Sequence, residues 1–149
     1  MREWVVAFSW SGATFGHPHG PPSWPRGGRA RSVEGMGRQA LVLRTVATDS
    51  TFERRALGGG VSWVGKCLHC GRKIVVSLGG ETAATIEHIV PRHHGGDDRE
   101  TNVALACARC NQDKGRTLDL RRANDPRYLE AIDRLLERRL ARLRDPATT

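Results

Sequence analysis

The stretch Thr85–Gly115, TIEHIVPRHHGGDDRETNVALACARCNQDKG, gives the clearest indication of the fold. The apolar run ATIEHIV predicts a strand that Pro91 ends, because proline has no amide hydrogen for a sheet ladder. A polar loop with a Gly-Gly pair follows, and NVALA predicts a second short strand. CARCNQDKG then begins a short helix that we expect to stop near Gly115. The predicted order is strand, loop, strand, helix.

Four cysteines bracket this stretch as two Cys-x-x-Cys pairs, Cys67 with Cys70 and Cys107 with Cys110. In a reducing compartment this spacing favours zinc bound by four thiolates, whereas in an extracellular protein two disulfides are the alternative. The segment between the pairs is long for a compact zinc ribbon, so we expect the predicted hairpin to bring them together. Four thiolates leave no open position for water, so the zinc would be structural.

Several side chains within the stretch suit the hydrolysis of a phosphodiester. That reaction needs a base for water, a cation on the phosphate oxygens and a rigid support for both. His88 suits the base, because imidazole exchanges protons near neutral pH. Glu87 and Asn111 offer hard oxygen ligands for a divalent cation, and Asn102 has an amide that can tie the loop to the strand. Neighbours in a strand point to opposite faces, so Glu87 and His88 share a cleft only if the chain bends near Pro91.

This ordered combination resembles the HNH endonuclease family. The resemblance covers roughly residues 63–118 and rests on Glu87-His88-Ile-Val-Pro91, Gly95-Gly96, Asn102 and Cys107-x-x-Cys110-Asn111-x-x-Lys114. It implies a ββα-metal (His-Me) finger in which His88 is the general base and Asn102 orients the loop. It also implies that Glu87 and Asn111 hold Mg²⁺ or another divalent cation and that the four cysteines hold zinc. In the family the acid is often Asp and the last position often His, where this chain has Glu87 and Asn111.

Basic residues near the motif are candidates for binding nucleic acid. His93 and His94 lie in the polar loop, and Arg109 and Lys114 lie on the short helix, where solvent exposure is the alternative. The net charge of +8 and the pI of about 10.3 favour a polyanionic partner, although a solvated basic surface would give the same values. We expect the partner to be DNA, with RNA as an open alternative.

The remaining sequence predicts elements on both sides of the motif. Residues 1–36 are crowded with Gly, Pro and Arg and predict a disordered tail, and Met36 is a candidate true start. ALVLRTVAT predicts a strand and TFERRALGGG a short helix or turn. Trp63 is expected in the core, His69 exposed, and Lys73–Ser77 in a strand.

The C-terminal part predicts an amphipathic helix with Pro126 in its first turn and Asp125 or Asn124 as the cap. Its apolar stripe predicts packing on the core or on a partner protein. The stripe comprises Leu129, Ile132, Leu136, Leu140 and Leu143. Arginines cover the rest of this helix, and either a DNA backbone or solvent would suit them.

Together these patterns predict an α+β protein with a small ββα-metal core that structural zinc staples. We expect the nuclease domain at residues 37–120 and a basic helix at residues 121–149 packing on it. No run is long and apolar enough to span a membrane and no secretory signal is evident, which favours a cytoplasmic protein. A DNA endonuclease is the expected function, with its biological role (phage packaging, restriction or other) left open. A catalytically inactive zinc-stapled nucleic-acid-binding module is the alternative.

Overall fold

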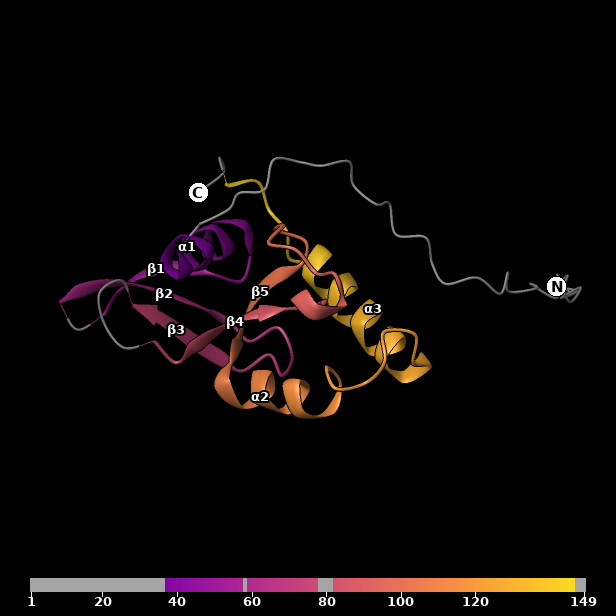
Figure 1. Cartoon of the computed structure of the whole chain (residues 1–149). Coiled ribbons are helices and arrows are strands. Elements are labelled where there is room, and N and C mark those ends of the chain that lie inside the picture. Colours follow the sequence, from indigo (N-terminus) through magenta and orange to yellow (C-terminus); the bar gives the residue numbers. More distant parts are fainter. Residues whose placement is uncertain (1–36, 58, 78–81, 147–149) are drawn as a thin grey trace, which may run out of the picture. The chain divides into compact units, whose positions relative to one another are not determined.

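The computed structural model describes residues 37–57, 59–77 and 82–146 (Figure 1). The predicted tail, residues 1–36, lies outside the described residues. Two antiparallel sheets and three α-helices make up the described chain. In chain order the elements are α1 (Arg38–Thr48), β1 (Glu53–Leu57), β2 (Gly60–Lys66), β3 (Lys73–Ser77), β4 (Ala84–His88), the 3₁₀ turn η1 (Arg92–His94), β5 (Val103–Cys107), α2 (Ala108–Thr117) and α3 (Pro126–Leu140).

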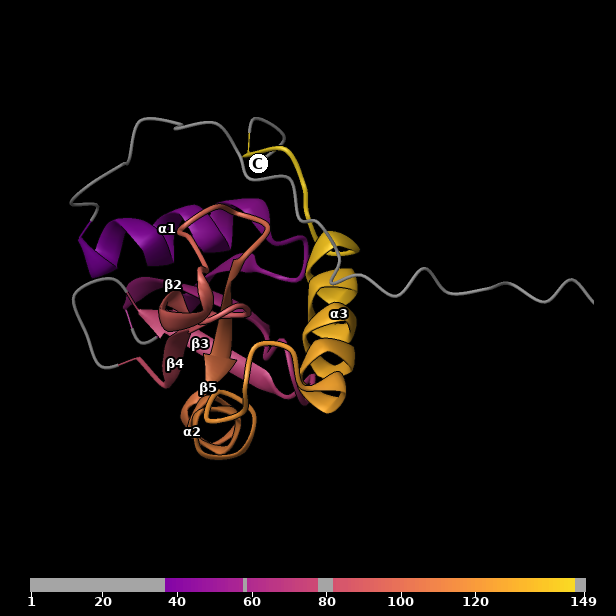
Figure 2. The ribbon, with the colours of Figure 1, turned by 45° about the vertical axis from the view of Figure 1, so that its right-hand side comes forward.

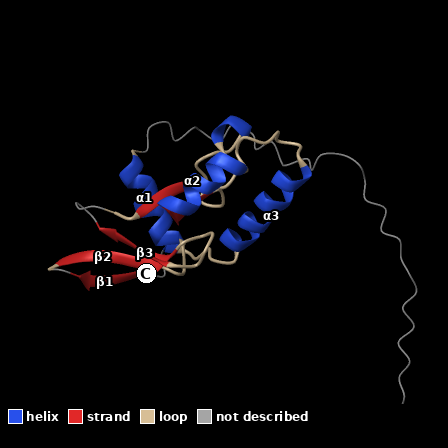
Figure 3. Ribbon diagram, turned by 90° about the horizontal axis from the view of Figure 1, so that it is seen from below, coloured by secondary structure: helices blue, strands red, loops and turns tan. Residues whose placement is uncertain are grey.

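Strands β1, β2 and β3 form one sheet in that order, and they run side by side in Figure 3. Strands β4 and β5 form a separate hairpin in which Ala84 lies opposite Cys107 and His88 opposite Val103. Figures 1 and 2 place α1 and α2 at opposite sides of this hairpin, with α3 beside it. The hairpin followed by α2 is the predicted strand, loop, strand, helix unit, and the α+β class is confirmed.

The hairpin is the common wall of two apolar clusters. Leu105 on one face packs with Val46 of α1 and with Phe52, which lies before β1. Ala104 on the other face packs with Leu68 of the Cys67–Cys70 turn and with a set of α3 residues. That set is Tyr128, Ile132 and Leu135. Because side chains alternate along a strand, β5 serves both clusters with neighbouring residues.

The strand predicted over ALVLRTVAT is wrong, because these residues form α1. Leu41, Thr45 and Thr48 recur at helical spacing and are buried. The hydroxyls of Thr45 and Thr48 donate to the carbonyls of Leu41 and Arg44, at 2.8 and 2.9 Å. Packing and these hydrogen bonds therefore outweigh the weak strand preference of β-branched residues.

The short helix or turn predicted over TFERRALGGG is also wrong, because Glu53–Leu57 forms the exposed edge strand β1. The composition of this segment does not favour a strand, and its hydrogen-bonded pairing with β2 stabilises the extended conformation. Trp63 of β2 is half-buried against the first cluster, and the strand Lys73–Ser77 is confirmed.

Helix α3 is confirmed from its first turn onward. Pro126 is the first residue, and the Asp125 carboxylate accepts hydrogen bonds from the backbone amides of Arg127 and Tyr128. The buried face is Tyr128, Ile132, Leu135 and Arg139, whereas Leu140 is 53% exposed. Three residues of the predicted stripe, Leu129, Ile132 and Leu136, pack in or against the second cluster. No described helix has the length and apolar character needed to cross a membrane.

The arginines near the end of α3 bind backbone carbonyls of this chain. Arg138 donates to the Leu68 and His69 carbonyls at 2.8 and 2.6 Å, and Arg142 donates to the Lys66 carbonyl at 3.1 Å. Arg139 is fully buried and donates to the Glu100 carbonyl at 2.9 Å. The sequence left a DNA backbone or solvent as the partner of these arginines. In the structure these side chains instead bind carbonyls of the chain itself and hold α3 against the rest of the fold.

Candidate functional site

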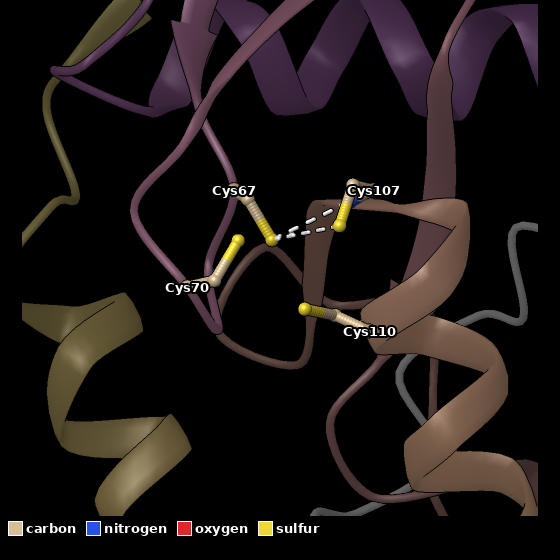
Figure 4. Close-up of side chains that lie close together, drawn as sticks. All are labelled: Cys67, Cys70, Cys107 and Cys110. Atoms are coloured by element: carbon tan, nitrogen blue, oxygen red, sulfur yellow. Dashed lines mark hydrogen bonds between the residues drawn. The ribbon is translucent and has the colours of Figure 1, made fainter.

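Two groups of candidate functional residues lie around the hairpin. The first is formed by Cys67 and Cys70 in the turn between β2 and β3, by Cys107 at the end of β5, and by Cys110 in the first turn of α2. Figure 4 shows the four sulfur atoms turned toward one another. All four Sγ atoms lie within 4.8 Å of one another, and all are free thiols.

This geometry fits a zinc ion. Zn–S bonds of about 2.3 Å in a tetrahedron place sulfur atoms about 3.8 Å apart, and the Sγ atoms of Cys67 and Cys107 are 3.9 Å apart. Gly71 follows the second ligand with a φ of 69°, the left-handed conformation that closes the turn. The backbone amide of Arg72 lowers the pKa of Cys70 to about 6, while burial raises the pKa of Cys110 to about 12. A cation bound by the four sulfur atoms would favour their thiolate form.

The second centre is a cleft of about 490 Å³ between α1, β4 and α2. It brings together residues that are far apart in the sequence, among them His88 and Asn111. Its lining is Arg38, Leu41, Thr85, Ile86, His88, Arg92 and Asn111. Polar groups suited to a base, a cation ligand and phosphate contacts thus share one open site.

His88 is the last residue of β4 and has a side chain that is 21% exposed. Its Nε2 lies 2.8 Å from Oδ1 of Asp98, in the loop between the strands. No other described residue hydrogen-bonds the ring. Nδ1 is therefore the ring nitrogen left for a water.

Asn102 ties the loop to the end of β4. Its Oδ1 accepts from the Val90 amide at 2.8 Å, and its Nδ2 donates to the Val90 and Asp97 carbonyls at 3.1 and 2.8 Å. Gly96 allows this close approach, because a Cβ there would lie 1.7 Å from the Val90 carbonyl oxygen. Gly95 has a φ of 90°. A side chain at either position of the pair would therefore be sterically unfavourable.

Asn111 projects from the first turn of α2 and is fixed by β4. Its Nδ2 donates to Oγ1 of Thr85 and to the carbonyl of Ile86, both at 3.1 Å. Both contacts use the amide nitrogen, so Oδ1 has no hydrogen bond to a described residue. An oriented amide oxygen with a free lone pair suits a hard cation.

Glu87 does not join His88 in the cleft. Its side chain is fully buried, with Oε1 at 2.9 Å from Nζ of Lys114 and Oε2 at 3.3 Å from Nε2 of His69. Neither oxygen has a well-angled hydrogen bond in the described chain, so charge holds the carboxylate there. The strand alternation that opposes a shared cleft holds at this position, because the chain does not bend before His88.

The exposed position predicted for His69 is wrong. Its side chain is only 16% exposed, and its Nε2 lies 3.3 Å from Oε2 of Glu87. The residue between the two cysteines of this turn thus connects the cysteine cluster to β4.

The four predicted nucleic-acid contacts have different surroundings. Lys114 is 4% exposed, and its ammonium also contacts Asp119 at 2.8 Å and the His88 carbonyl at 3.0 Å, which leaves no position for a phosphate. His94 packs edge-on against Tyr128, and burial lowers its pKa. Nε2 of His93 lies 2.9 Å from the Asp119 carbonyl. The Arg109 side chain is 77% exposed, and its Nε lies 3.8 Å from Oδ2 of Asp113.

Three residues of the cleft region were not singled out from the sequence. Arg38 comes from the helix mistaken for a strand, and Arg92 and Asp98 flank the Gly-Gly pair. The acidic run after the glycines was a signal for Asp98, because a carboxylate in a loop beside a candidate base is a natural partner. Arg38 gave no local signal, since only the packing of α1 brings it near β4.

Comparison with known proteins gives one family match. Residues 67–117, which include both cysteine pairs, the hairpin and α2, match the family model described as HNH endonuclease. The resemblance found in the sequence is thereby confirmed. No curated protein and no solved structure matches the chain. The match indicates a nuclease or nucleic-acid-binding function, and the cysteine cluster indicates zinc.

Proposed function

From the HNH endonuclease match of residues 67–117, we propose that this protein is a metal-dependent endonuclease that hydrolyses phosphodiester bonds of DNA. The observation that carries the proposal is the shared cleft of His88 and Asn111, with Arg38 and Arg92 on its walls. A base, a cation ligand and two guanidinium groups are the parts that the reaction requires.

His88 would act as the general base. With Nε2 occupied by Asp98, Nδ1 accepts a proton from a water molecule. The oxygen of that water then attacks phosphorus, the bond from phosphorus to the leaving sugar oxygen breaks, and the leaving oxygen takes a proton from solvent. Asn102 contributes by holding the loop that carries Asp98.

Mg²⁺ or another divalent cation would supply positive charge to the phosphate oxygens. The described residues fit this ion in part. Oδ1 of Asn111 is oriented toward such a role, whereas Lys114 and His69 hold the carboxylate of Glu87 on the other face of β4. Mg²⁺ usually keeps several waters and takes few protein ligands beside substrate phosphates. We therefore assign Asn111 as the protein ligand and give Glu87 the role of fixing α2 to β4.

Arginine suits phosphate because its planar guanidinium donates two parallel hydrogen bonds. Arg38 is exposed at the start of α1 and has no partner among the described residues, so it is available to a DNA strand in the cleft. Arg109 extends the same charge along α2. The zinc would remain structural, joining the β2–β3 turn to α2.

The test is cleavage of supercoiled, linear and single-stranded DNA and of RNA, each with and without Mg²⁺. We expect DNA to be cut only with the divalent cation. Asn111→Ala is expected to raise the Mg²⁺ concentration needed for half-maximal rate by about tenfold or more, whereas Asn124→Ala, at an exposed turn, should not. Binding of DNA without cleavage under every condition would overturn the enzyme and favour the binding module.

A further inference from the structure

We propose that Asp98 is a positioning residue for the base: its carboxylate fixes the ring and the tautomer of His88. The inference rests on the proposed function and adds to it a residue outside the set expected from the sequence. The carboxylate lies 2.8 Å from Nε2 of His88, and both side chains are about a quarter exposed or less, at 25% and 21%.

Asp98 is held in place by several independent contacts. Nη2 of Arg92 donates to both carboxylate oxygens, at 2.6 and 2.8 Å, and the Arg44 guanidinium of α1 donates to the Asp98 carbonyl. Asn102 binds the carbonyl of the preceding residue, Asp97, at 2.8 Å. A loop restrained at its backbone and at its charged end places the carboxylate with little freedom to move.

The consequence for the base follows from the chemistry of imidazole. In neutral histidine one ring nitrogen carries the proton and the other accepts, and the hydrogen bond of one decides the role of the other. The hydrogen bond from His88 and the charge of Arg92 lower the pKa of Asp98, so its carboxylate is ionised at neutral pH and can only accept. Nε2 therefore carries the proton, and Nδ1 keeps the lone pair that takes a proton from water.

The first experiment compares Asp98→Ala with Asp97→Asn as a matched control, since the Asp97 side chain is half-exposed and pairs with Arg99. At saturating Mg²⁺ we expect Asp98→Ala to lower kcat by at least about tenfold, a part of the roughly 100- to 10,000-fold that general-base catalysis supplies. The Asp97→Asn variant should change kcat and the KM for DNA by less than about twofold, since it alters neither the cleft lining nor the base. In a His88→Ala background, Asp98→Ala should have no further effect.

The second experiment measures the tautomer of the His88 ring directly. Nitrogen NMR of protein labelled with ¹⁵N-histidine should show only the Nε2-protonated tautomer of neutral His88 in the wild type and a mixture of both tautomers in Asp98→Ala. This reading needs no activity, so it separates failure of the inference from failure of the proposed function. An unchanged kcat, an Asp98→Ala rate restored by more Mg²⁺, an additive effect with His88→Ala, or an unaltered tautomer would each overturn the positioning role. Restoration by Mg²⁺ would instead make Asp98 a cation ligand.

Discussion

At the scale of single residues, two neighbours in the sequence lie in different environments. Glu87 and His88 are adjacent, yet one is fully buried against Lys114 and the other lines an open cleft. A strand that does not bend before His88 separates them. The pairing of Glu87 and His88 in one cleft, which the family motif implied, is therefore absent from the described structure.

The buried pair of Glu87 and Lys114 leads to a stability prediction. Lys114→Met removes the cation and leaves the Glu87 carboxylate charged inside the fold, so we expect a loss of about 3–5 kcal/mol in the free energy of unfolding. Chemical denaturation of zinc-loaded protein measures it. Adding Glu87→Leu should recover part of the loss, because the stranded charge is then gone. A single variant as stable as the wild type would show that the pair contributes nothing.

Gly96 leads to a second residue prediction. Gly96→Ala places a methyl group 1.7 Å from the Val90 carbonyl oxygen, so the loop must shift. We expect a loss of about 1–3 kcal/mol, together with reduced cleavage at normal zinc content. Gly115→Ala in α2 is the matched control, because no atom lies within 4 Å of its added Cβ. Equal behaviour of the two variants in a thermal melt would contradict the steric reading.

At the scale of elements, the motif-bearing half of the fold was predictable and the flanks were not. Strands β4 and β5 and helix α2 follow from Pro91, the Gly-Gly pair and the cysteine spacing, which are local signals. Helix α1 depends on packing against the hairpin, so its β-branched residues led to the wrong prediction of a strand. Strand β1 has only exposed residues, and its pairing with β2 stabilises it. The position of Arg38 in the cleft could not be predicted while α1 was taken for a strand.

At the scale of the whole molecule, the cysteine cluster and α3 support the same turn. Arg138 and Arg142 bind carbonyls next to and between Cys67 and Cys70, and Cys107 is the residue before α2. Loss of the metal should therefore loosen the β2–β3 turn, α2 and α3 together.

Metal removal tests this coupling. Structural zinc sites contribute several kcal/mol or more to folding, so stoichiometric chelation should lower the Tm by more than about 10 °C. Elemental analysis should give one zinc per chain before chelation. A Tm that stays the same after complete removal of the metal would show that the cysteines are not the staple of the fold.

The most direct test of the central claim, that the His88 cleft hydrolyses DNA, is Mg²⁺-dependent nicking of supercoiled plasmid by wild type and His88→Ala at equal zinc content. The wild type should convert supercoiled plasmid to open circles. The variant should keep its zinc and its Tm but lose at least about 100-fold in rate, because the base is gone while the separate cysteine centre is intact. Nicking by His88→Ala at the wild-type rate would contradict the account.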